Sequence, residues 1–414
     1  MKRNGREFTP WHRPVQKIEL SEKYIKPRGI LALMCLILGI ALMGYGLMSA
    51  LNTDPTWQKI EVSSSEPHCG GDFQLMYDFN DAGGTASTQE KTLTALYSQA
   101  SVEGYRLFSP DLLEEGLGNV AWLNAHVNEI VKVEPGLYRA LEQVASSGNR
   151  QVFLAPGMEQ YRHVFTSVTD AEAAEFDPAK NEEVGKWFAE LASFVSDPEA
   201  VNVVLYGENQ AMLSVSQAYL AFAQENEVAR FLDFGWMTNA FLADFLAETL
   251  TENGFTKGYV TSNDGYTRNL DPRGQEYYAN LMAGQGTNLV SPGQMVYKAP
   301  ASLVMFHRFS LEPGDSYTYA SGEAVTVYLD PEDCRSKAAT ESLLAYSAQL
   351  GCGELLLQTA DIYTADSLDT GALSGLRDQG IYSVWCKEKT VFYNDPALGL
   401  VLRKDGGYTA SFMN

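Results

Sequence analysis

The clearest feature of the hydrophobic pattern is one unbroken apolar run at residues 29–51, which contains no Asp, Glu, Lys or Arg. At 1.5 Å of rise per residue, a helix of this length spans roughly 34 Å, and the hydrocarbon core of a membrane is about 30 Å thick. A helix at the surface of a soluble domain carries a polar face, and this run has none. The pattern therefore predicts one transmembrane helix at 29–51.

The charges beside this run predict its orientation. Eight basic residues precede it: Lys2, Arg3, Arg6, Arg13, Lys17, Lys23, Lys26 and Arg28. Three acidic residues share that tail, so its net charge is +5, and the flank after residue 51 opens with Asp54. Positive flanks stay in the cytoplasm. The basic segment and the apolar run are both too long for a cleaved signal peptide. We predict a cytoplasmic tail at 1–28, a single-pass anchor at 29–51, a linker at 52–71 and an extracytoplasmic domain at 72–414.

The remaining pattern mixes both kinds of element. Apolar positions recur at helical spacing in six segments, 88–100, 136–145, 182–194, 217–229, 236–253 and 340–349. Eight segments look like strands: 73–79, 201–206, 211–215, 258–261, 302–309, 324–329, 354–357 and 389–393. Helices and strands do not alternate in a strict βαβ order. The fold class predicted from the pattern is α+β.

Composition narrows the partners of this domain. Hydrophobic residues make up 45% of the chain and aromatic residues 11%, as in a packed globule. The net charge of the whole chain is −22 and that of the tail is +5, so the net charge from residue 29 onward is −27. Such a charge argues against nucleic acid or anionic lipid as the partner of the domain. Four cysteines lie in the domain without CxxC spacing, Cys69, Cys334, Cys352 and Cys386. Disulfides and buried free thiols both remain open.

The familiar catalytic motifs are missing. The chain has no Walker loop, GxGxxG, HExxH or GxSxG. None of its five histidines stands at metal-ligand spacing from another ligand, so no metal ligand and no catalytic residue is assigned. Asp361 and Asp366 are interpreted as part of a solvated loop. The pair Tyr277-Tyr278 is interpreted as strand packing.

One segment carries a candidate site. Asp233 and Gly235 stand at the start of the predicted helix 236–253, where unpaired backbone N–H groups can cradle a phosphate. The turn at residues 263–265, Asn-Asp-Gly, follows the next strand and can lie beside the same ligand. The alternative is structural: Asp233 caps the helix and Gly265 serves a hairpin.

The same segment resembles the ApbE family of FAD:protein FMN transferases. That family carries the stretch Asp-Leu-Gly-Gly-Ile-Ala-Lys-Gly-Tyr-Ala-x-Asp, and residues 233–244 fall on its frame. The turn at 263–265 falls on the family's later Gly-Gly-Asp turn. Three further stretches agree in order: Leu-Asn at 123–124, Phe-Asp-Pro at 176–178 and Val-Tyr-Leu-Asp-Pro at 327–331.

The resemblance implies an ApbE-like mixed-sheet domain on the outer side of a bacterial membrane. It implies FAD as the ligand, Mg²⁺ on its pyrophosphate, and transfer of FMN to a Ser or Thr of an exported partner protein. Carried over residue by residue, the implied cofactor-binding residues are Asn124, Asp233, Gly235, Asn239, Asp244, Asp264 and Gly265.

Departures from the family fall on the positions that handle phosphate and metal. Asn239 replaces the family's lysine, and Asn263 and Asp264 replace its paired glycines. Gly353 and Leu357 stand where the family has its metal-binding Asp and Thr. Three functions therefore compete: flavinyl transfer; a catalytically silent domain that binds a flavin, another ligand or a protein partner; and an unrelated extracellular hydrolase or structural module.

Overall fold

The computed structural model describes residues 57–80, 86–285, 288–308 and 314–413. The predicted tail and the predicted transmembrane helix at 29–51 lie outside these ranges. Among the described residues, no helix has both the length and the apolar character needed to cross a membrane.

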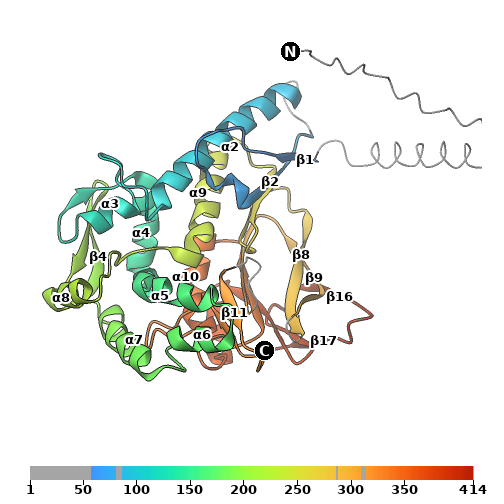
Figure 1. Cartoon of the computed structure of the whole chain (residues 1–414). Coiled ribbons are helices and arrows are strands. Elements are labelled where there is room, and N and C mark those ends of the chain that lie inside the picture. The colour runs from blue at the N-terminus through green and yellow to red at the C-terminus, as the bar shows by residue number, and fades with distance from the viewer. Residues whose placement is uncertain (1–56, 81–85, 286–287, 309–313, 414) are drawn as a thin grey trace, which may run out of the picture. The chain divides into compact units, whose positions relative to one another are not determined.

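A mixed sheet of nine strands organises the domain (Figure 1). Its spatial order is β1 (Trp57–Ile60), β2 (Phe73–Asp78), β6 (Gly258–Ser262), β7 (Thr267–Asn269), β10 (Ala301–His307), β13 (Ser342–Ser347), β14 (Tyr382–Lys387), β15 (Thr390–Tyr393) and β17 (Thr409–Phe412). Neighbouring strands run antiparallel, except β15 and β17, which are parallel. This arrangement confirms the predicted α+β class.

Helices cover one face of this sheet. They include α2 (Ala86–Phe108), α9 (Thr238–Glu252), α10 (Cys352–Tyr363) and α11 (Thr370–Arg377), and α4 (Pro135–Ser147) packs on α2 and α10. Helix α9 is the centre of the layer, because it packs on α2, α10, β6 and β7 together. Every residue from Ala240 to Ala247 on α9 is buried. A helix with no exposed face belongs inside a domain of this size.

Smaller elements complete the domain (Figure 1). The helices are α3 (Val120–Ala125), α5 (Ala155–Phe165), α6 (Asp170–Phe176), α7 (Glu182–Val195) and α8 (Gln217–Glu225). Three 3₁₀ turns are η2 (Cys69–Gly71), η3 (Gln151–Phe153) and η4 (Gly235–Met237). A small sheet joins β3 (Val131–Lys132), β5 (Gln210–Val215) and β4 (Val201–Gly207), and β11 (Ser316–Thr318) pairs with β12 (Ala324–Thr326).

A second, three-stranded sheet packs on the opposite face of the main sheet. Its order is β16 (Gly399–Leu402), β9 (Asn288–Lys298) and β8 (Glu276–Gln285). Side chains of β10 alternate between the two layers: Leu303 and Met305 belong to the cluster under the small sheet, and Val304 and Phe306 belong to the helical core. Every residue of β10 is buried for this reason.

Two predictions of element type are wrong. Residues 340–349 were expected as a helix, but β13 lies there, in the interior of the main sheet with all six residues buried. Residues 354–357 were expected as a strand, but they lie in α10, which the core surrounds. Burial on both sides removes the polar face from a strand and from a helix alike, so periodicity cannot separate them.

The structure also differs from the expected linker and strands, and it settles the state of the cysteines. The segment expected as a linker contains β1, which pairs with β2. The long β8–β9 hairpin was not expected from the pattern. The four cysteines of the domain are all buried and all free, so of the two alternatives left open, the structure has free thiols.

A cleft beside the β6–β7 turn

The turn at residues 263–265 connects β6 to β7, as the sequence predicted. The backbone N–H of Gly265 donates to the carbonyl oxygen of Ser262 across 3.1 Å. Gly265 has a φ of +99°, a region that residues with a Cβ rarely adopt. A Cβ there would also lie 3.0 Å from the Cβ of Met305. The glycine is therefore required by the hairpin itself.

The middle residue of the turn, Asp264, is held by two neutral donors. The Asn239 Nδ2 on the first turn of α9 donates to Asp264 Oδ2 across 3.1 Å, and the Ser262 hydroxyl donates to Oδ1. Burial raises the pKa of Asp264 to about 6, and these two hydrogen bonds lower it only in part. At neutral pH the carboxylate is ionised at an energetic cost.

Asp264 and Gly265 lie on the wall of a cleft of about 540 Å³. The cleft runs between the β6–β7 hairpin and the β8–β9 hairpin, and Leu303, Met305 and Leu344 contribute to its lining. Its volume falls in the range of small-molecule sites, about 300–1,000 Å³. Four tyrosines line it: Tyr259, Tyr277, Tyr278 and Tyr297.

An ion network built on two buried carboxylates positions the aromatic wall. Arg273 forms two hydrogen bonds to Asp271, through Nε to Oδ1 and through Nη2 to Oδ2, each at 2.8 Å, and a third to Asp78 at 2.7 Å. The hydroxyl of Tyr277 donates to Asp271. Burial acts to raise the pKa of Asp271, but these donors outweigh burial and the pKa is lowered. The network ties the start of β8 to β2 and fixes the ring of Tyr277 at the cleft.

Three of the predicted site residues have local structural partners. The Asp233 carboxylate accepts from the backbone N–H of Gly235 at 2.9 Å, and Gly235 has a φ of +51°. The Asn124 side chain accepts from the N–H groups of Phe231 and Leu232 and donates to the Leu232 carbonyl oxygen at 2.7 Å. These contacts shape the loop that leads into α9. None of the three lines the cleft.

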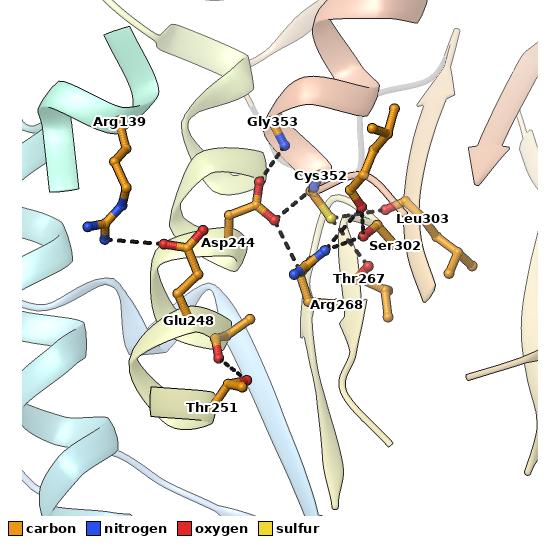
Figure 2. Close-up of polar contacts among 12 residues, drawn as sticks. Arg139, Asp244, Glu248, Thr251, Thr267, Arg268, Ser302, Leu303, Cys352 and Gly353 are labelled. Carbon is orange, nitrogen blue, oxygen red and sulfur yellow. Dashed lines mark hydrogen bonds and ion pairs between the residues drawn. The ribbon is translucent and has the colours of Figure 1, made fainter. Parts of the chain in front are cut away.

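Asp244 faces the start of α10 instead of the cleft (Figure 2). Its Oδ1 accepts from the N–H of Cys352 and its Oδ2 from the N–H of Gly353, each at 2.8 Å. The Arg268 Nε lies 3.1 Å from Oδ1 as an ion pair. Burial raises the pKa of Asp244 to about 6, against the charge of Arg268 and the two amides. The carboxylate stabilises the positive end of the helix dipole and joins α9, α10 and β7.

The residues at the family's metal positions do not fit Mg²⁺. Magnesium needs several oxygen ligands, and Gly353 and Leu357 offer none from their side chains. A Cβ on Gly353 would lie 2.7 Å from both the Phe241 ring and Gln143 Oε1, so a longer ligand side chain has no room there. Both Asp244 oxygens already accept backbone N–H groups. Within the described residues, no cluster of three His, Cys, Asp or Glu side chains is placed to hold a metal ion.

The side chains around Asp264 do not suit the pyrophosphate of FAD either. A pyrophosphate carries negative charge and needs cationic or N–H partners, whereas the side chains presented here are a carboxylate and an amide. The structure thus brings together Asn239, Asp264 and Gly265 from the predicted set, and separates from them Asp244, Asn124 and the Asp233 turn. Their role in cofactor binding stays a prediction.

The tyrosine wall is the part of this site that the sequence interpretation missed. Tyr277 and Tyr278 were assigned to strand packing, yet both line the cleft and Tyr278 is 61% exposed. The signal available in the sequence was the adjacent pair itself, because neighbouring residues in a strand point to opposite faces and cannot both pack in one core. Tyr259 and Tyr297 come from other strands, and only the tertiary structure places them on the same wall.

Comparison with solved structures shows which known proteins have a similar fold. The flavin transferase ApbE from Vibrio cholerae superposes with a TM-score of 0.51 at 11% identity, over 84% of this chain and 98% of that chain. The ApbE protein from Thermotoga maritima gives 0.49 at 12% over the same shares, and apo flavinyl transferase ApbE from Pseudomonas stutzeri gives 0.46 at 12%, over 80% and 92%. The sequence matches no protein-family model and no curated protein. The described domain has the ApbE fold at low sequence identity.

Proposed function

We propose that this ApbE-like domain binds a small planar aromatic ligand in the tyrosine-lined cleft and has no Mg²⁺-dependent flavinyl transfer activity. The observation that carries the proposal is the cleft itself, with about 540 Å³ of space and four tyrosines on its lining. Tyrosine faces stack on planar rings. The flavin ring is the first ligand to try, because proteins of this fold include flavin transferases.

The case against transfer is the chemistry of the residues at the family's reactive positions. Gly353 and Leu357 supply no metal ligand, and Asp264 places a negative charge where the family has glycine. A ligand without phosphate groups meets neither difficulty. Riboflavin, which has the flavin ring and no phosphate, suits this cleft better than FAD does.

We further propose that residues 29–51 anchor the domain, with residues 1–28 in the cytoplasm and the cleft on the outer side. The apolar run and its basic flank support this orientation. The cleft then faces exported ligands or exported proteins. Accessibility of single added cysteines to a membrane-impermeant reagent in intact cells tests this topology: a cysteine at residue 5 should be protected and one at residue 389 labelled.

Calorimetric titration of the full-length protein in detergent tests ligand binding. Riboflavin, FMN and FAD are each titrated with and without MgCl₂. We expect riboflavin to bind most tightly, FAD most weakly, and Mg²⁺ to change none of the three affinities. Tyr259→Leu should weaken riboflavin binding, and Tyr206→Leu, an exposed tyrosine outside the cleft, should not. Mg²⁺-dependent binding of FAD would overturn the proposal, and so would the failure of every flavin and every other planar aromatic probe to bind.

A direct transfer assay separates the competing enzyme function. The full-length protein is incubated with FAD, MgCl₂ and a peptide of the type Asp-x-x-Thr-Gly-Ala-Thr. The mass of the peptide is then measured by mass spectrometry. We expect no added mass of FMN. Peptide labelled with FMN, and unlabelled when a chelator is present, would establish the transferase instead.

A further inference from the structure

The cleft presents negative charge and no positive charge. Two carboxylates line it, Asp264 on the β6–β7 turn and Glu276 at the start of β8. Among the described residues that line it, none is Lys, Arg or His. The remaining polar lining is neutral hydroxyl and amide. The electrostatic field inside the cleft therefore favours a cation over an anion.

Asp264 is a desolvated carboxylate without a basic partner. Its side-chain oxygens accept hydrogen bonds from Ser262 and Asn239, which are neutral. No Lys or Arg in the described part of the chain lies within ion-pair distance of it, whereas Asp244 has Arg268 and Asp330 has Lys337. Burial raises the pKa of Asp264, because removal from water destabilises its ionised form. A cationic ligand would supply the missing counter-charge.

The tyrosines provide the second part of a cation site. The ring of Tyr277 contacts those of Tyr259 and Tyr297, with centroid distances of 6.1 Å and 6.0 Å. Burial raises the pKa of Tyr297 to about 12, so this phenol stays neutral at physiological pH. Neutral aromatic faces attract cations, with about 0.5–2 kcal/mol for each contact. Acidic and aromatic groups on one wall are the chemistry that recognises organic ammonium and iminium ions.

We propose that the cleft selects a planar organic cation, held by Asp264 at one end and by the faces of Tyr259, Tyr277 and Tyr297 along its body. This inference rests on the proposed function and adds the charge of the ligand to it. Glu276, at the start of β8, supplies a second carboxylate to the lining of the cleft. The ligand class is an aromatic ammonium or iminium compound with no phosphate.

Three tricyclic probes of one shape test the charge preference. 10-Methylacridinium is a cation, acridine is neutral at pH 8, and acridine-9-carboxylate is an anion. Each is titrated into the full-length protein in detergent at pH 8 and low salt. We expect the cation to bind at least tenfold more tightly than acridine, and the anion to bind most weakly. Equal affinities for the cation and the neutral ring would overturn the inference.

Variants assign the preference to Asp264. Asp264→Asn keeps the size of the side chain and removes its charge, so it should reduce cation affinity about tenfold and leave acridine affinity unchanged. Asp361→Asn is the matched control and should change neither affinity, because Asp361 is a carboxylate outside the cleft that likewise accepts hydrogen bonds from neutral donors, Asn149 and Gln151. Circular dichroism checks that each variant folds. Should Asp264→Asn fail to fold, Glu276→Gln gives the second test, with an expected loss of two- to threefold.

The outcomes separate this inference from the function on which it rests. Binding of riboflavin and acridine with no preference for the cation leaves the aromatic site standing and refutes its charge selectivity. Failure of every flavin and every tricyclic probe to bind refutes the aromatic site as well. A cation preference that survives in Asp264→Asn refutes the role given to Asp264.

Discussion

The Nδ2 of Asn239 lies 3.1 Å from the Oδ2 of Asp264, which joins the first turn of α9 to the β6–β7 turn. The family resembled by this chain has a lysine at the first position and a glycine at the second. A lysine and an open backbone would favour phosphate there. An amide bonded to a carboxylate does the opposite, because the amide carries no positive charge and the carboxylate adds a negative one. This pair is the reason for proposing a different ligand.

The charge of Asp264 should lower stability at neutral pH. Its pKa is about 6 in the folded protein, above its ordinary value of 3.8, so the folded state holds more protons between these values. Stability therefore falls as pH rises from about 4 to about 6. Asp264→Asn should raise the free energy of unfolding by about 1–3 kcal/mol at pH 7.5 and give no gain at pH 4. Urea denaturation of the full-length protein at both pH values measures this.

Asp330→Asn is the matched control for that measurement. Asp330 lies 2.7 Å from the ammonium nitrogen of Lys337, so loss of its charge should lower stability at pH 7.5. A gain of stability in both variants would point to a general effect of net charge on this acidic chain, and would contradict a specific cost at Asp264.

Asp244→Ala should be strongly destabilising. It removes the acceptor for two backbone N–H groups of α10 and the partner of Arg268, all inside the core. Removing one member of a buried ion pair costs about 3–5 kcal/mol. Glu248→Ala is the control on the same helix. Glu248 forms an ion pair with Arg139 (Figure 2), and these side chains are 40% and 48% exposed, so the loss should be less than about 1 kcal/mol. Similar losses in both variants would refute the special role of Asp244.

Gly353→Ala should lower stability because its Cβ would lie 2.7 Å from the Phe241 ring. A forced contact of this kind in a packed core costs about 1–3 kcal/mol. In helix α11, Gly375→Ala meets no atom within 4 Å and should be neutral or stabilising by up to about 1 kcal/mol. Thermal unfolding of both variants makes the comparison. A neutral Gly353→Ala would mean that a family-like side chain can be accommodated at the start of α10.

Lys337 acts as a common counter-ion for a group of carboxylates. Its ammonium nitrogen lies 2.7 Å from Asp330, 2.9 Å from Asp333 and 3.6 Å from Asp366. Lys337→Met leaves these charges to repel one another and should cost about 1–3 kcal/mol in the free energy of unfolding. The loss should shrink below pH 4, where the carboxylates become protonated. Lys186→Met, at an exposed pair with Glu182, should change stability by about 0.5 kcal/mol or less at either pH.

The order of short motifs was enough to predict the fold. The pieces around Asn124, Asp177, Asp233, Asp264 and Asp330 lie in the ApbE order, and the structure has that fold. Local predictions were also confirmed where a single residue type determines a helix start or a turn. Pro135 begins α4, where its missing N–H costs nothing, and the Asn-Asp-Gly turn closes a hairpin.

The sequence by itself determined the mixture of helices and strands, the acidic charge of the domain and the places where local residues set a turn or a helix start. Tertiary structure alone decided that residues 342–347 form a strand and 352–363 a helix, because both are buried on all sides and keep no polar face to mark their period. It also decided the site. Tyr259, Tyr277 and Tyr297 are far apart or unremarkable in the chain, and they form one wall because three strands of two different sheets meet beside Asp264.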